Sequence, residues 1–178
     1  MSVIRAIAVF LCGFLSLRVC RAQVLFPGAC PDVAAMADFN ANRVRYWPSF
    51  IRKGKNLLTI IGNVNDFSTG IQSEIQGEAN QVSRSDEGKL SVRFPSLPVN
   101  FAAPYWIVDT DYDNYALVWS CYDFGFFHTR NAWILTRERN PPLATLEKVY
   151  MAADKNNINR AYFMRTDQRN CPDNYNKV

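Results

Sequence analysis

The stretch that decides the fold runs from Pro104 to Cys121 and reads PYWIVDTDYDNYALVWSC. Two aromatic and β-branched runs flank a short turn rich in Asp and Asn, which predicts a β-hairpin with strands at Tyr105–Thr110 and Asn114–Cys121. A third run with the same bias, Asn131–Arg137, begins ten residues later. The Pro141-Pro142 pair then marks the start of a helix. The order is therefore strand, turn, strand, loop, strand, helix.

Further strands are predicted on the N-terminal side of this hairpin, at Leu57–Asn65, Gly70–Ala79 and Lys89–Phe94. Short strands at such spacing, separated by turn-prone residues, indicate an all-β meander of antiparallel strands. Apolar and polar residues alternate from Lys89 onward, so that Leu90, Val92 and Phe94 share one face of the strand. That face should be buried and the opposite face exposed to solvent.

The C-terminal part predicts one helix, from Pro142 to about Asp154, whose apolar stripe should dock on the outside of the sheet. The stripe consists of Leu143, Leu146, Val149 or Tyr150, and Ala153. Arg160–Met164 is predicted to form a last short strand. The segment Asp32–Asn42 is mixed and short, and we expect it to be irregular or 3₁₀-helical.

Residues 1–22 have the pattern of a secretory signal peptide: Arg5, an uncharged apolar run from Ala6 to Leu17, and small residues before a cleavage point near Gln23. The apolar run is too short to span a bilayer as a helix. No later stretch reaches eighteen apolar residues. We therefore expect an exported, extracellular chain with no transmembrane segment, in which residues 23–178 form one domain.

The basic character of the chain belongs mostly to this leader. Its removal takes away three arginines and no acidic residue, so that the formal net charge falls from +4 to +1, with 17 basic against 16 acidic residues. Nucleic-acid or anionic-membrane binding needs a clustered basic face. We expect no nucleic-acid partner.

The cysteine count of the mature chain is odd. Cys30, Cys121 and Cys171 remain after residues 1–22 are removed. In an oxidising compartment one thiol must then lack a partner within the chain.

The element order, with Thr110–Ala116 at the turn and the run Trp133–Arg137 before the helix, resembles a lipocalin. Within the family the chain is most similar to the branch of apolipoprotein D and the insect bilin-binding proteins. The agreement is close from about Ile71 to Cys171 and includes Ile75–Ala79 and Thr166–Cys171. The resemblance implies an antiparallel up-and-down barrel of the calycin type, with one C-terminal α-helix packed outside. It also implies a disulfide between Cys30 and Cys121.

The chain departs from the family between Phe39 and Thr59. Phe39–Arg43 resembles the lead-in to the first lipocalin strand and Leu58–Asn63 resembles the third, so that only Val44–Leu57 is left for the rest of the first strand and the whole second strand. On the order of twenty residues are missing, given usual strand lengths. The sequence therefore predicts an incomplete barrel, an open seven-stranded sheet with two exposed edges.

Three residues are affected by this gap. The usual partner of Cys171 is a cysteine in the second strand, which this sequence lacks, so Cys171 is expected to be unpaired. Trp47 has two interpretations: it is the remnant of the signature tryptophan of the first strand, or it belongs to the first loop and that strand is lost. Arg137 is assigned by resemblance a structural role, stacking on the signature tryptophan at the closed end.

The resemblance also implies a ligand cavity. It places Trp133 and Leu135 inside the barrel, Tyr105 and Ile107 near the open rim, and Asn63 and Asn65 at polar cavity positions. The predicted buried face of the Lys89–Phe94 strand adds further candidates. The full set of proposed ligand-binding residues is Trp133, Leu135, Tyr105, Ile107, Asn63, Asn65, Leu90, Val92 and Phe94. An apolar pocket with a few polar groups is typical of a small-molecule site, and the alternative is that these residues are ordinary barrel core.

Catalysis has little support in the sequence. There is one histidine, His128, which we expect in a loop or at the rim, and there is no nucleophile elbow, metalloprotease motif or phosphate loop. A Cys171–His128 nucleophile pair is weakened because Cys171 lies in a tail whose usual role is a disulfide. We expect no enzyme activity, cofactor or metal site.

The function predicted from these observations is a secreted carrier that transports a small hydrophobic ligand: a lipid, sterol, fatty acid, retinoid, carotenoid or bilin. The alternative is a truncated or alternative form without a functional pocket, which acts through protein–protein association or through its free thiol, as in a homodimer linked by Cys171. The aromatic segments Phe94–Phe101 and Tyr122–Phe127 either pack over the rim, which we favour, or contact a lipid particle or a partner.

Overall fold

The computed structural model describes residues 24–44, 50–52, 57–65, 72–82, 86–96 and 102–166; in the strands between positions 50 and 76 it describes the backbone alone. The predicted signal peptide, Trp47 and Cys171 lie outside the described residues.

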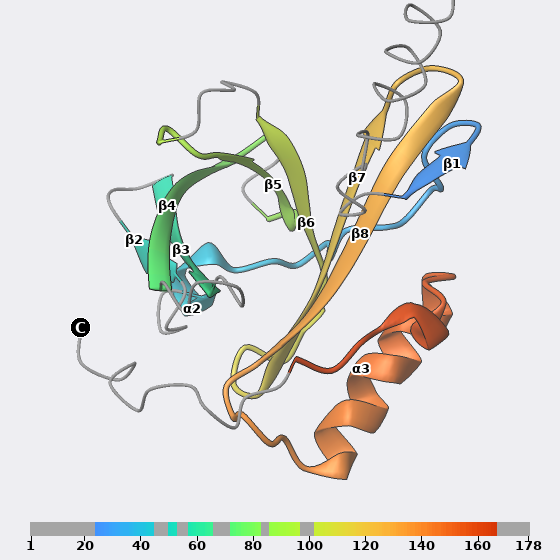
Figure 1. Ribbon diagram of the computed structural model, residues 1–178. Helices are drawn as coiled ribbons and strands as arrows, with labels where there is room; N and C mark the ends of the chain where they lie inside the picture. Colours follow the sequence, from blue (N-terminus) through green and yellow to red (C-terminus); the bar gives the residue numbers. More distant parts are fainter. Residues whose placement is uncertain are drawn as a thin grey trace, which may run out of the picture.

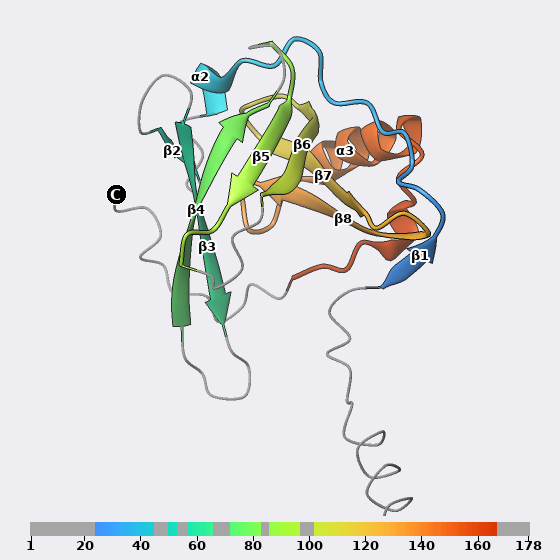
Figure 2. The same ribbon diagram turned by 90° about the horizontal axis from the view of Figure 1, so that it is seen from above.

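One antiparallel sheet of eight strands makes up most of the molecule, in the order β1-β8-β7-β6-β5-β4-β3-β2. The strands are β1 (Leu25–Pro27), β2 (Phe50–Arg52), β3 (Leu57–Asn65), β4 (Gln72–Gln81), β5 (Lys89–Arg93), β6 (Ala103–Thr110), β7 (Tyr115–Asp123) and β8 (Phe127–Thr136). From β2 to β8 each strand pairs with the next in the chain, as an up-and-down meander requires. The sheet curls, and β2–β4 lie across its concave side from β7 and β8 (Figure 1; Figure 2).

The barrel is not closed. Among the described strands, no pairing joins β2 at one end of the sheet to β1 or β8 at the other. The prediction of an incomplete antiparallel barrel is therefore confirmed. The six long strands were also predicted, and β3 has the expected limits.

The structure differs from the prediction in its two shortest strands, in the start of β8 and in the segment near the C-terminus. The three-residue strands β1 and β2 were not predicted, so the sheet has eight strands rather than seven. Strand β8 begins at Phe127, four residues before the predicted start, because Phe127–Thr129 pair with β1. The predicted strand Arg160–Met164 is wrong, since Arg160–Tyr162 forms a 3₁₀ turn (η1) in which the side chain of Asn159 accepts the N–H of Ala161.

Helix α3 (Leu143–Lys155) packs on the convex side of the sheet, as predicted, on the side of β7 opposite β2–β5 (Figure 1). Its contacts form the outer cluster, whose buried members are Val33, Val108, Tyr115, Leu117, Trp119, Val149, Ala153 and Ile158. The stripe is shorter than expected: Val149 and Ala153 are fully buried, whereas Leu143 is exposed. No helix in the described part of the chain is long and apolar enough to cross a membrane.

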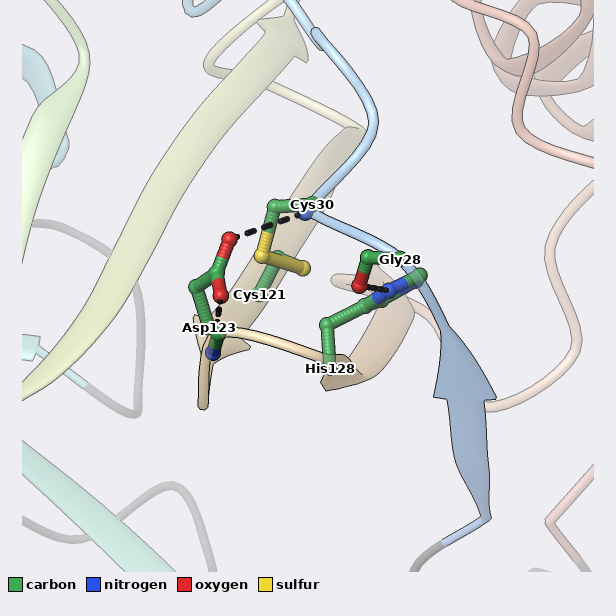
Figure 3. Close-up of a disulfide and its surroundings, with 6 residues drawn as sticks. Gly28, Cys30, Cys121, Asp123 and His128 are labelled. Carbon is green, nitrogen blue, oxygen red and sulfur yellow. Dashed lines mark hydrogen bonds between the residues drawn. A yellow bond between two sulfur atoms is a disulfide. The ribbon is translucent and has the colours of Figure 1, made fainter.

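The N-terminal segment is tied to the far end of the β7–β8 hairpin. The disulfide Cys30–Cys121, implied by the resemblance, is present and joins positions 91 residues apart in the sequence. Figure 3 shows that His128 and Asp123 flank this link: His128 Nδ1 lies 2.8 Å from the carbonyl oxygen of Gly28, and the Asp123 carboxylate accepts the backbone N–H of Cys30. Strand β1 is thereby held against β8.

The turn between β6 and β7 is organised by one carboxylate. Asp111 Oδ1 accepts the backbone N–H groups of Asp113, Asn114 and Tyr115 at 2.7–3.1 Å, and Oδ2 accepts the side-chain amide of Asn114. Burial by itself would raise the pKa of Asp111, but these hydrogen bonds together hold it below its ordinary value of 3.8. The same turn holds Tyr112 at a positive φ of 66°.

We expect the double variant Cys30→Ala/Cys121→Ala to lower the free energy of unfolding by about 2–5 kcal/mol, because the disulfide closes a long loop of the unfolded chain. Urea unfolding followed by circular dichroism measures this change. Cys171→Ser is the matched control and should leave the unfolding curve unchanged. Equal stability of the double variant and the parent would contradict the structural role of the link.

Asp111→Ala should cost about 1–3 kcal/mol of stability at pH 7, since it removes a charged acceptor of several hydrogen bonds. A carboxyl whose pKa is lowered in the folded state stabilises the protein above its unfolded pKa, so this contribution is lost as pH falls below about 4. Urea unfolding at pH 7 and pH 3 should show the difference between parent and variant shrinking in acid. Asp111→Asn, which keeps the Oδ1 acceptor, should lose less; a difference that is the same at both pH values would refute this account.

Candidate ligand-binding site

The concave side of the sheet carries a second set of buried apolar residues, the inner cluster. Its members are Phe39, Val44, Ala79, Leu90, Val92, Ile107, Tyr112, Ala116 and Val118. Met36, Ala41, Phe94, Tyr105 and Leu135 pack against it. Because side chains alternate along a strand, β7 contributes Ala116 and Val118 to this cluster and Leu117 to the outer one.

The N-terminal segment closes one end of the concave side. Met36 donates its N–H to the Ile107 carbonyl and accepts the N–H of Gly88, and Phe39 donates to the Asp86 carbonyl. The helix α2 (Ala41–Val44) follows, where the sequence suggested only an irregular lead-in to a strand. This segment is therefore a floor beneath the inner cluster.

Tyr112 completes the floor from the β6–β7 turn. Its ring stacks on Phe39 with 6.3 Å between centroids, and its hydroxyl accepts the backbone N–H of Asn40 at 2.8 Å. The guanidinium of Arg43 lies 4.2 Å from the centre of the Tyr112 ring, a cation–π contact. Arg137 donates from Nη2 to the Tyr112 carbonyl, so its guanidinium lies beside this floor. Its expected stack on Trp47 falls outside the described residues.

Tyr105 and Trp133 form an aromatic pair on the concave side. Their rings are nearly parallel, with centroids 6.1 Å apart and an interplanar angle of 21°. Burial raises the pKa of the Tyr105 hydroxyl. Trp133 lies opposite Val118 on β7 and therefore shares the face of the inner cluster, yet 42% of its surface is exposed. The pair therefore lies at the boundary between the buried apolar residues and solvent.

Phe94 fills space that β4 leaves open. A Cβ atom on Gly77 would lie 2.7 Å from the Phe94 ring, so the ring rests directly on the glycine backbone. Gly77 was not singled out from the sequence. It belongs to the Ile75–Ala79 motif and is needed for this packing.

The predicted ligand-binding residues whose side chains are described lie together. Leu90, Val92 and Ile107 are buried members of the inner cluster, and Phe94, Tyr105 and Leu135 pack against it. Asn63 and Asn65 are on β3, where only the backbone is described. The sequence analysis missed Ala116, Val118, Phe39, Val44 and Tyr112. The first two could have been found from cross-strand pairing, because Val118 faces Trp133 and Ala116 faces Leu135.

His128 is not at a rim or in a loop, which corrects the expectation. It is 4% exposed, stacks on Phe26 with 5.6 Å between centroids, and bonds to Gly28, so it secures β1. Cys171, its conceivable catalytic partner, lies outside the described residues. Among those residues no cluster of three or more His, Cys, Asp or Glu side chains could hold a metal ion.

The aromatic hairpin between β7 and β8 does not pack over the rim. Phe124 stacks on Phe127 with 5.3 Å between centroids and makes a tilted contact with Tyr122 at 4.9 Å, and Phe126 is 93% exposed. In the other aromatic segment, Phe94–Phe101, residues 97–101 lie outside the described ranges.

A separate hollow of about 290 Å³ lies on the convex side, between the N-terminal segment and β5–β6. Its lining comprises Asp32, Val33, Ala34, Ala35, Ala37, Glu87, Lys89 and Trp106. Lys89 occupies part of it, 3.5 Å from the Glu87 carboxylate and 5.5 Å from the centre of the Trp106 ring. None of the predicted ligand-binding residues lines this hollow.

Comparisons with known proteins agree with this architecture. The family model described as "Lipocalin / cytosolic fatty-acid binding protein family" matches residues 54–170. Apolipoprotein D of Cavia porcellus is 42% identical over 169 residues, which cover 85% of this chain and 88% of that protein. The Lazarillo protein of Schistocerca americana is 34% identical, covering 73% of this chain and 69% of its own length.

Solved structures show the same fold. Insecticyanin from the tobacco hornworm Manduca sexta aligns with a TM-score of 0.65 at 22% identity, over 82% of this chain and 89% of that one. Lobster apocrustacyanin A1 aligns with a TM-score of 0.64, also at 22% identity, over 84% and 92%.

The buried hydroxyl of Tyr105 predicts a loss of stability at high pH. The unfolded chain ionises its tyrosines near pH 10, whereas folding raises the pKa of Tyr105, so ionisation favours unfolding as pH rises above about 10. In urea unfolding between pH 9 and 11, Tyr105→Phe should therefore lose less stability than the parent. Tyr162→Phe, at an exposed position, is the control. Parallel losses in the parent and Tyr105→Phe would contradict this assignment.

Proposed function

Because this chain belongs to the lipocalin / cytosolic fatty-acid binding protein family, we propose that it is a secreted carrier of one small hydrophobic ligand. The single observation that carries the proposal is the inner cluster, a set of buried apolar residues on the concave side of the sheet, bordered by the Tyr105–Trp133 pair. Secretion is supported by the signal-peptide pattern of residues 1–22. The ligand would be a lipid, sterol, fatty acid, retinoid, carotenoid or bilin.

The binding residues of this proposal are those predicted from the sequence. Trp133 and Tyr105 would supply aromatic faces, and the apolar lining would come from Ile107, Leu90, Val92, Phe94 and Leu135. Asn63 and Asn65 would supply polar groups that orient the ligand. Burial of apolar area, at about 25 cal/mol per Å², is the driving term. An apolar surface discriminates ligands mainly by shape, which is why the class stays broad.

No catalytic step is part of this proposal. His128 already bonds to the Gly28 carbonyl beneath β1, and it is not a member of the inner cluster. The arrangement serves reversible burial of a ligand rather than bond making or breaking.

A second candidate is association without a ligand, through the edges of the open sheet or through Cys171. The lack of a pairing between β2 and β8 among the described strands favours this second candidate. The two functions are separable, because one needs the concave face and the other needs the edge.

Ligand binding should change tryptophan fluorescence. We expect a saturable change on titration with retinol, biliverdin or arachidonate, because Trp133 borders the inner cluster. Trp133→Phe should remove most of the change. Trp106→Phe should retain it, since Trp106 packs with the outer cluster on the convex side.

Phe126→Ser distinguishes this site from non-specific adsorption to the exposed hairpin, and it should leave the titration unchanged. The proposal fails if none of the three ligands gives a saturable change. It also fails if Trp133→Phe responds like the parent.

A further inference from the structure

The far edge of β8 is largely open. Strand β8 has ten residues and pairs along nearly its whole length with β7, but β1 pairs only with Phe127, His128 and Thr129. Of the described strands, none pairs with the other edge of Arg130–Thr136. The burial of the concave face falls toward this edge: Ile107, Val118 and Trp133 lie in one row across β6, β7 and β8, and are 2%, 0% and 42% exposed.

The backbone groups that point outward along this edge can be identified. In an antiparallel pair, hydrogen-bonded and non-bonded positions alternate. Phe124 donates its N–H to the Phe127 carbonyl, and Arg137 donates to Asn114, so the odd-numbered residues of β8 bond to β7. The even-numbered residues therefore direct their N–H and C=O groups outward. On the open part these are Arg130, Ala132, Ile134 and Thr136.

The pairing of β1 agrees with this assignment. Gly28 donates its N–H to the Phe126 carbonyl, which belongs to the even-numbered set. Pro27, which has no N–H, faces the odd-numbered Phe127, where no donor is needed.

The open edge is self-complementary about Trp133. Two antiparallel copies centred there would place Ala132 opposite Ile134 and Arg130 opposite Thr136. Residues whose backbone groups point outward would then face one another. Both copies would supply the same patch, as a twofold interface requires. Trp133 would face its own copy at a non-bonded position, where side chains approach most closely. No like charges would stand directly opposite one another.

Exposed edges in natural sheets are usually blocked by charged residues, proline, bulges or a short length. Here the centre of the edge is the apolar run Ala132-Trp133-Ile134-Leu135. Seven residues of this edge pair with no other described strand, and Arg130 is the single charged side chain among them. The edge is suited to pairing rather than protected against it.

We propose that two copies of this chain associate by antiparallel pairing of their Arg130–Thr136 edges around a twofold axis at Trp133. The association is non-covalent and continues the sheet from one copy into the other. It does not depend on ligand binding, and it differs from a dimer linked through Cys171.

The test uses position 133, which in the proposed dimer faces the same position of the second copy. In a Cys171→Ser background and non-reducing buffer, which preserves Cys30–Cys121, sedimentation velocity should show a dimer that dissociates on dilution. Trp133→Lys alone and Trp133→Glu alone should each be monomeric, since like charges then meet at the axis. An equimolar mixture of the two should regain the dimer mass. Leu143→Lys, an exposed change on α3, is the control and should remain dimeric.

Ala132→Pro is a second variant for the case in which a charge at position 133 unfolds the chain. It removes an outward N–H and leaves the hydrogen bonds to β7 in place, so it should be folded by circular dichroism and monomeric. A parent that is monomeric at every concentration overturns the proposal, and so does a dimer that persists in both Ala132→Pro and Trp133→Lys. Failure of the mixed Lys and Glu variants to associate, with both folded, overturns the pairing around Trp133.

Discussion

Strand β7 buries apolar side chains on both of its faces, and the two layers of the molecule meet along it. Ala116 and Val118 belong to the inner cluster, whereas Leu117 and Trp119 belong to the outer cluster beneath α3. A shift of one residue in its pairing would exchange the two faces and place each set of side chains in the wrong layer. The register is held at one end by the Asp111 turn and at the other by the Cys30–Cys121 disulfide.

The N-terminal segment connects these two fixed ends. It is anchored by β1 and the disulfide at the hairpin end, then crosses to the opposite end, where Met36 and Phe39 bond to the backbone of the sheet and its loops. Tyr112 joins it there through Asn40. One continuous stretch therefore supports β8 and supplies the floor of the concave side, which gives the apolar surface a closed end.

The open edge of β8 explains why Trp133 is exposed beside a row of buried residues. In a row across the sheet, Ile107 and Val118 are buried and Trp133 is half exposed, because among the described strands β7 alone lies beside β8 at that point. Trp133 therefore borders both the concave face, where we propose that a ligand binds, and the edge of β8, where we propose that a second copy pairs.

The sequence by itself determined the elements with a strong local signal. The six long strands follow from runs bounded by turn-prone residues, three of them rich in aromatic and β-branched residues, and α3 follows from the 3.6-residue repeat. Alternation from Lys89 onward also placed Leu90, Val92 and Phe94 on one face. The resemblance of the flanking segments to lipocalin strands indicated that too few residues lie between Phe39 and Thr59, and the open sheet was predicted from this. Only the tertiary structure decided the rest. Strands β1 and β2 have three residues each and carry no periodic signal. Each forms because it pairs with a longer strand, β1 with β8 and β2 with β3. His128 is buried because Phe26 and Gly28, a hundred residues earlier, cover it, and Trp133 is exposed because no described strand lies beside it, which no local pattern can encode.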